Sequence, residues 1–150
     1  MGRWVGIDYG RRRIGIALSD SREIIASPAT TLDAVGDPAR DVQGVLTWAA
    51  EAVGAELAGF VVGFPLNMDG SVGPQARLAE RFADELRRGC ASSGGLPPAV
   101  ELWDERLTSF QADQVMRAAG LSRRRQKRRR DALAAQVILQ SFLDSRQQAG

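Results

Sequence analysis

Apolar and polar positions alternate along this chain in a pattern that predicts a mixed β-sheet flanked by helices. Two short apolar runs near the start are separated by residues 10–12, a link short enough for a β-hairpin. A continuous apolar run at residues 57–63 is typical of a central parallel strand that is covered on both faces. Strands are predicted for five segments: residues 3–10, 13–20, 23–28, 57–63 and 99–103, the third of them stopped by Pro28.

Helical spacing of apolar residues fills the gaps between these strands. Val42, Val45, Leu46, Ala49 and Val53 repeat with the period of a helix of about four turns, and Pro38 suits its first turn. Further helices are predicted over residues 75–88, after a cap at Thr108 or Ser109, and from within residues 123–130 through residue 143. The alternation of strands and helices in 150 residues predicts one α/β domain over residues 1–150.

Isolated carboxylates stand at the ends of two predicted strands. Asp8 closes the first strand, and an ionised carboxylate buried there without a partner would cost several kcal/mol, so a cation, a metal or backbone donors are expected beside it. Asp104 and Glu105 follow the strand at residues 99–103. Because side chains alternate along an extended chain, only one of these two can join Asp8, and the sequence leaves open which one. Arg106 could instead pair with one of them at the surface.

A third carboxylate lies on the predicted C-terminal helix. Asp131 shares a helix face with small and apolar residues, namely Ala134, Ala135, Ile138 and Phe142. It could pair with Arg128 or Arg130, or it could meet the other acids at one edge of the sheet. Three such carboxylates could hold two divalent ions, and oxygen ligands favour magnesium or manganese.

Composition narrows the chemistry further. The chain has no histidine, which excludes a Ser-His-Asp triad, a Cys-His dyad and imidazole acid–base catalysis, so carboxylates must carry any reaction. Its single cysteine, Cys90, cannot form an internal disulfide or a zinc site. No run of eighteen apolar residues and no signal-peptide core is present, so we expect a cytoplasmic protein that does not associate with a membrane.

Positive charge is concentrated in one segment. Seven of the eight residues at 123–130 are basic, whereas the rest of the chain has thirteen basic and 18 acidic residues, a net charge of −5. All but one of the basic residues are arginines, which suit bidentate phosphate contacts and stacking on unpaired bases. The segment therefore predicts nucleic acid as the partner. The loop at residues 64–74, between a parallel strand and a helix, could also meet a phosphate or could be a plain turn.

Four motifs in chain order closely resemble those of the YqgF/RuvX family, RNase H-like nucleases related to RuvC Holliday junction resolvases. The first motif is Gly6-Ile7-Asp8-Tyr9-Gly10 with residues 13–17 and Ser19-Asp20, and the second is Val62-Gly63-Phe64-Pro65-Leu66-Asn67-Met68-Asp69-Gly70. The third is Asp104-Glu105-Arg106-Leu107-Thr108-Ser109, and the fourth covers residues 131–139. The resemblance implies an RNase H-like fold with a five-stranded mixed sheet flanked by helices. It also implies that Asp8, Glu105 and Asp131 are the catalytic and metal-binding acids.

The leading hypothesis is a nuclease that needs Mg²⁺ or Mn²⁺ and cuts structured or single-stranded RNA, in the family's role of processing the 5′ end of pre-16S rRNA. The residues expected to bind nucleic acid are Arg11, Arg12, Arg123, Arg124, Arg125, Lys127, Arg128, Arg129 and Arg130. One alternative is a Holliday junction resolvase acting on four-way DNA, which would need a dimer. Others are a catalytically silent nucleic-acid-binding module and an actin-like phosphotransferase, for which the chain is short. The sequence leaves a monomer and a homodimer both open.

Overall fold

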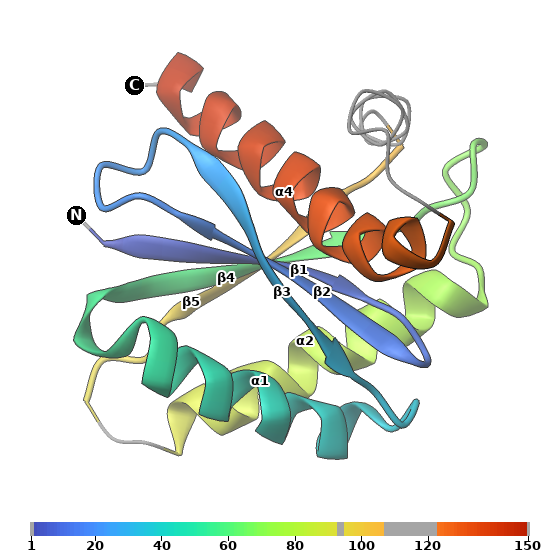
Figure 1. The fold of residues 1–150 in the computed structure, drawn as a ribbon, viewed down its shortest axis with the longest axis horizontal. Coiled ribbons are helices and arrows are strands. Elements are labelled where there is room, and N and C mark those ends of the chain that lie inside the picture. The colour runs from blue at the N-terminus through green and yellow to red at the C-terminus, as the bar shows by residue number, and fades with distance from the viewer. Residues whose placement is uncertain (1, 93–94, 107–122, 150) are drawn as a thin grey trace.

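The computed structural model describes residues 2–92, 95–106 and 123–149 and contains a five-stranded mixed sheet with helices on both faces (Figure 1). The strand order is β3-β2-β1-β4-β5, in which β1, β2 and β3 are antiparallel neighbours and β4 and β5 run parallel to β1. The elements are β1 (Arg3–Tyr9), β2 (Arg13–Ser19), β3 (Ala26–Asp33), α1 (Pro38–Ala52), the short 3-10 helix η1 (Gly54–Glu56), β4 (Leu57–Phe64), α2 (Pro74–Ala91), β5 (Ala99–Asp104) and α4 (Arg123–Ala149). The predicted α/β fold class is confirmed.

The two faces of the sheet are covered by different helices because side chains alternate along each strand. On one face, Val5, Ile7 and Tyr9 of β1 pack with Phe60 and with residues of α1 and α2. On the other face, α4 crosses the sheet (Figure 1). Its buried residues pack against a second cluster of strand residues: Trp4, Ala17, Ala26 and Val61. Asp8 therefore belongs to the same strand face as Trp4, the face that α4 covers.

The predicted hairpin joins β1 to β2. The amide of Gly10 donates to the carbonyl of Arg13 at 2.9 Å, and the ladder pairs Asp8 with Gly15. The hairpin turn thus lies at the edge of the sheet where β1, β4 and β5 end, because those three strands run in the same direction. This edge is where the sequence placed its carboxylates.

The third strand differs from the prediction. Strand β3 begins at Ala26 and runs through Pro28 to Asp33, instead of stopping at the proline. Pro28 is tolerated because β3 is the edge strand of the sheet in the described part of the chain, where one side of its backbone has no ladder partner. The register with β2 shifts next to it, so that Ala17 pairs with Pro28 and Ile16 with Thr30. Because of this register shift, the strand continues although Pro28 has no N–H to donate to the ladder.

The helices begin where their caps predict. Asp37 caps α1, its side chain accepting a hydrogen bond from the amide of Ala39 at 3.2 Å, and Pro74 opens α2. Helix α4 begins at Arg123 and continues to Ala149, past the predicted end at residue 143. The helix predicted after Thr108 or Ser109 lies outside the described residues. No helix in the described part of the chain is both long enough and apolar enough to cross a membrane.

Candidate active site

Asp8 lies under the first turns of α4. Its ladder partner Gly15 has no side chain, and a Cβ built there would overlap the backbone carbonyl of Asp131. A Cβ on Gly6, two residues before Asp8, would likewise meet α4 at Ala135 and Leu139. These glycines allow α4 to approach the sheet closely, which brings the helix carrying Asp131 next to the end of β1.

Glu105 faces the same side of the sheet. Two residues earlier, Trp103 packs edge-on against Phe142 of α4 with ring centroids 5.5 Å apart, so alternation directs the Glu105 side chain toward the α4 face as well. The amide of Glu105 still donates to the carbonyl of Phe64, at 3.2 Å. The Glu105 carboxylate lies over Gly63, where a Cβ would overlap it. Of the two adjacent acids, Glu105 is therefore the one that lies beside Asp8.

Asp104 is held by Arg106 instead. The Arg106 guanidinium contacts Asp104 through Nη2 and Oδ2 at 2.7 Å, and the Arg106 amide donates to Oδ1 at 2.9 Å. These hydrogen bonds hold the pKa of the Asp104 carboxyl below its usual value. The surface pairing of Arg106 that the sequence allowed is thus formed with Asp104, and it leaves Glu105 on the other face.

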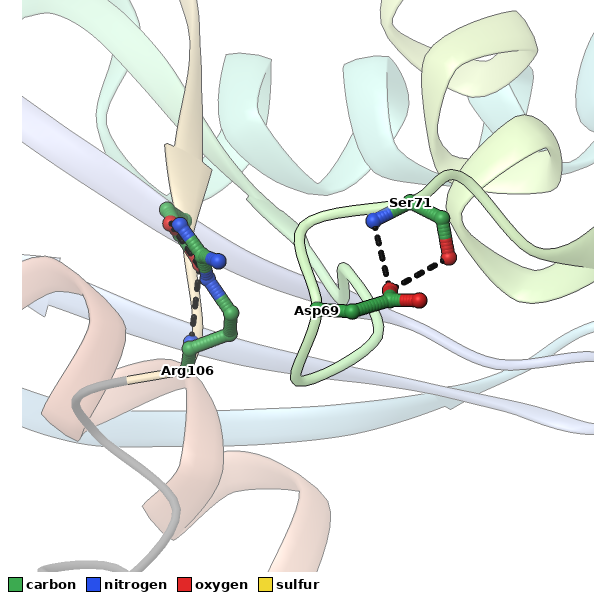
Figure 2. A network of polar contacts seen from close by, with 4 residues as sticks. Asp69, Ser71 and Arg106 are labelled. Carbon is green, nitrogen blue, oxygen red and sulfur yellow. Dashed lines mark hydrogen bonds and ion pairs between the residues drawn. The ribbon is translucent and has the colours of Figure 1, made fainter.

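The loop after β4 approaches this segment. Figure 2 shows Asp69 and Ser71 on the loop, with Arg106 facing them from the end of β5. The Ser71 hydroxyl and amide both donate to Asp69 Oδ1, at 2.6 and 2.9 Å, and this lowers the pKa of Asp69, with a smaller contribution from Arg106. Gly70, with a φ of 87°, provides the left-handed residue that the turn requires. The loop is therefore ordered by its own hydrogen bonds, and its predicted phosphate contact stays a prediction.

The electrostatics of Asp8 and Glu105 are unusual for carboxylates. Burial raises the pKa of Asp8 to about 7, the nearby Asp131 adds to the rise, and the Arg130 guanidinium opposes it. Burial raises the pKa of Glu105 to about 8, and repulsion from Asp8 and then Asp104 adds to it. Desolvated acids that repel one another are stabilised by a cation between them.

Asp131 has a partner that the sequence analysis missed. Arg13 Nε donates to Asp131 Oδ2 at 2.8 Å, and the two side chains are 41% and 23% exposed. The side chain of Arg128, one of the two partners expected from the sequence, lies outside the described part of the chain. Arg13 could have been found from its position two residues before Gly15, on the strand face that α4 covers.

The donor set suits a hard divalent cation, although the acids do not yet form a complete cage. Among residues 2–92, 95–106 and 123–149, no three acidic side chains are gathered as a ready metal-binding group. Asp8 lies between the other two and interacts with both Asp131 and Glu105. Three carboxylates without nitrogen or sulfur ligands match the preference of Mg²⁺ and Mn²⁺ for oxygen. The residues therefore fit such an ion, with Arg13 as the present neighbour of Asp131.

The structure describes the side chains of only some of the basic residues that are predicted to bind nucleic acid. Arg11 and Arg12 are exposed in the β1–β2 turn, and Arg129 and Arg130 are exposed on α4. Arg123, Arg124, Arg125, Lys127 and Arg128 belong to the first turns of α4, but their side chains lie outside the described part. The described arginines border the same edge of the sheet as Asp8.

Comparison with solved structures identifies the fold. RuvC from Thermus thermophilus is similar over 97% of this chain and 96% of its own, with a TM-score of 0.57 and 14% identity. T. thermophilus RuvC in complex with a Holliday junction substrate aligns over 98% and 96% with a TM-score of 0.55 and 16% identity. The arrangement of sheet and helices is therefore the RNase H-like fold, as predicted.

Sequence comparison identifies the family. The RuvX family, described as "Holliday junction resolvase", matches residues 2–145, and this chain belongs to that family. A relative from Anaeromyxobacter dehalogenans (strain 2CP-C) is 46% identical, covering 96% of this chain and 98% of its own. Another from Chloroflexus aurantiacus is 42% identical, covering 95% and 86%. Both relatives carry the name "Putative pre-16S rRNA nuclease".

Proposed function

We propose that this protein is a divalent-metal-dependent nuclease that hydrolyses phosphodiester bonds in RNA, processing the 5′ end of pre-16S rRNA in the cytoplasm. The observation that carries the proposal is the position of Asp8 between Asp131 and Glu105, with burial and mutual repulsion holding the pKa of Asp8 near 7. Such an arrangement is unfavourable for an acid cluster alone and favourable once a cation is bound. The names of the relatives support an RNA substrate.

Asp8, Glu105 and Asp131 would hold Mg²⁺ or Mn²⁺. A bound divalent ion supplies an activated water and stabilises the leaving oxygen of a phosphodiester. The three carboxylates would place that chemistry at the edge of the sheet. Gly63 leaves room there for the Glu105 carboxylate, and Gly15 leaves room for the backbone of Asp131. Arg130, which already lowers the pKa of Asp8, is placed to offset the negative charge that a phosphate would bring. Arg11 and Arg12 would position the RNA backbone beside the acids.

The test is cleavage of a pre-16S rRNA fragment in Mn²⁺ and in Mg²⁺ by wild type and by Asp8→Asn. The variant keeps the shape of the side chain but removes its charge, so we expect its cleavage rate to fall by at least about 100-fold. RNA binding in EDTA is expected to stay within about threefold of wild type. Equal cleavage rates for the two proteins would refute the assignment.

Holliday junction resolution is a second candidate. It is supported by the description of the RuvX family and by the fold shared with RuvC. Resolution requires two symmetric cuts and therefore a dimer. A four-way DNA junction offered in the same assay separates the candidates, because symmetric nicking of the junction without RNA cleavage would favour the resolvase and reject the RNA nuclease.

A further inference from the structure

A groove lies between the edge strand β3 and the first turns of α4. Its volume is about 430 Å³, and it is lined by Arg13 from β2, by Thr30, Thr31 and Asp33 from β3, and by Arg129 from α4. Among the strands that the structure describes, β3 has a ladder partner only on its β2 side. The groove thus has guanidinium groups on both walls and threonine hydroxyls along one of them.

Arg13 joins this groove to the candidate active site. Its Nε atom donates to Asp131, and within the described part of the chain its two Nη groups donate to no protein acceptor. The planar guanidinium can therefore bind Asp131 along one edge and an anion in the groove along another. Any anion held there lies one side chain away from the acids.

A phosphodiester is the ligand whose chemistry fits these groups. It carries one negative charge and accepts hydrogen bonds, whereas the side chains of Arg13, Arg129 and Thr30 carry donors. Phosphate contacts from arginine and threonine position a nucleic-acid backbone without reading its sequence.

We propose that this groove is a phosphate subsite that binds the RNA backbone next to the bond cut beside Asp8, a proposal that rests on the proposed function. Binding in the groove aligns the RNA chain along the side of α4 that faces β3. Asp33 lies on the groove wall and repels the ligand, so it limits the affinity. Changes at Arg129 and at Asp33 therefore act in opposite directions on the same ligand.

The test measures binding of a short 5′-fluorescein-labelled single-stranded RNA by anisotropy in EDTA, over a series of KCl concentrations. We expect Arg129→Gln to weaken binding about three- to tenfold and to reduce the slope of log affinity against log salt by about 0.7, the loss of one phosphate contact to a single strand. We expect Asp33→Asn to tighten binding about two- to threefold. The matched control is Arg40→Gln, which removes the same charge from α1 on the opposite face of the sheet, where the Arg40 side chain is 80% exposed.

The outcomes separate this proposal from the nuclease assignment. Unchanged binding by Arg129→Gln, an equal loss in Arg40→Gln, or no tightening by Asp33→Asn would each overturn the groove, even if wild type cleaves RNA. Opposite effects of the two groove variants would support RNA binding in the groove, even if Asp8→Asn cleaves as fast as wild type and the nuclease assignment fails. Urea unfolding of each variant, with a midpoint expected to match that of wild type, shows that the fold is intact.

Discussion

Arg13 and Asp131, 118 residues apart in sequence, form an ion pair that joins β2 to α4 at 2.8 Å. The pair holds Asp131, one of three candidate metal ligands, in place. The other two candidates, Asp8 and Glu105, both have raised pKa values, and repulsion from Asp8 contributes to the rise at Glu105. If Asp131 binds the proposed metal ion, Arg13 competes with that ion for the Asp131 carboxylate.

Removing the Arg13 charge should strengthen metal binding. Arg13→Gln frees Asp131 from a cation, so Mn²⁺ measured by isothermal titration calorimetry is expected to bind about three- to tenfold more tightly. The pair is partly exposed, and the cost in unfolding free energy should be only about 0.5–1 kcal/mol. Arg40→Gln is the control for a general charge effect. Weaker Mn²⁺ binding by Arg13→Gln would show that Arg13 assists the ligands instead of competing with the ion.

The raised pKa of Asp8 predicts a specific dependence of stability on pH. The unfolded chain loses the Asp8 proton near its ordinary pKa of 3.8, whereas the folded protein keeps it to about 7, so wild type loses stability as the pH rises through that window. Asp8→Asn has no proton to lose there. In EDTA the variant should be more stable than wild type by about 1–3 kcal/mol near pH 8, with the difference shrinking toward pH 4, as measured by urea unfolding.

Metal should reverse that order. Mn²⁺ bound by the acids stabilises the folded state alone, so it should raise the melting temperature of wild type and leave Asp8→Asn nearly unchanged. A pH-independent difference between the proteins in EDTA would contradict the burial of Asp8. No melting shift with Mn²⁺, together with salt-dependent RNA binding, would favour the silent binding module.

The two adjacent acids should differ strongly in their effect on catalysis. Glu105→Gln removes a carboxylate that lies beside Asp8 and should lower kcat for RNA cleavage by about 100-fold or more. Asp104→Asn changes a carboxylate that already pairs with Arg106 on the other side of the strand, and kcat should fall by no more than about threefold. Single-turnover cleavage of the same rRNA fragment measures both. A larger loss of kcat in Asp104→Asn than in Glu105→Gln would show that Asp104, and not Glu105, acts in catalysis.

The close approach of α4 to the sheet should depend on Gly15. A methyl group there would overlap the carbonyl of Asp131, so Gly15→Ala must displace the helix and should cost about 2–4 kcal/mol of unfolding free energy. Gly44→Ala is the matched control, because no atom lies within 4 Å of a Cβ at that helical position. It should stabilise α1 by up to about 1 kcal/mol. Urea unfolding at one pH compares the two, and equal effects would mean that α4 does not need Gly15.

Local sequence patterns were sufficient for most of the architecture. Hairpin β1–β2, the parallel strands β4 and β5 and the start of α1 were each predicted, because turn length, continuous apolar runs and capping residues act over a few neighbouring positions. The predicted end of β3 at Pro28 was wrong, because a proline ends a strand only where the ladder requires an N–H donor at that position. That condition depends on the strand's place at the sheet edge, which local sequence does not specify.

The sequence by itself determined which residue types are available for chemistry, namely carboxylates without histidine and a run of arginines. It also determined, through the alternation of side chains, that only one of Asp104 and Glu105 can join Asp8. Only the tertiary structure decided that this acid is Glu105 and that Arg13 holds Asp131. Both depend on how closely α4 and β5 approach the sheet, which is fixed by packing between elements distant in sequence. Alternation sets the relative directions of neighbouring side chains, whereas packing sets what each one meets.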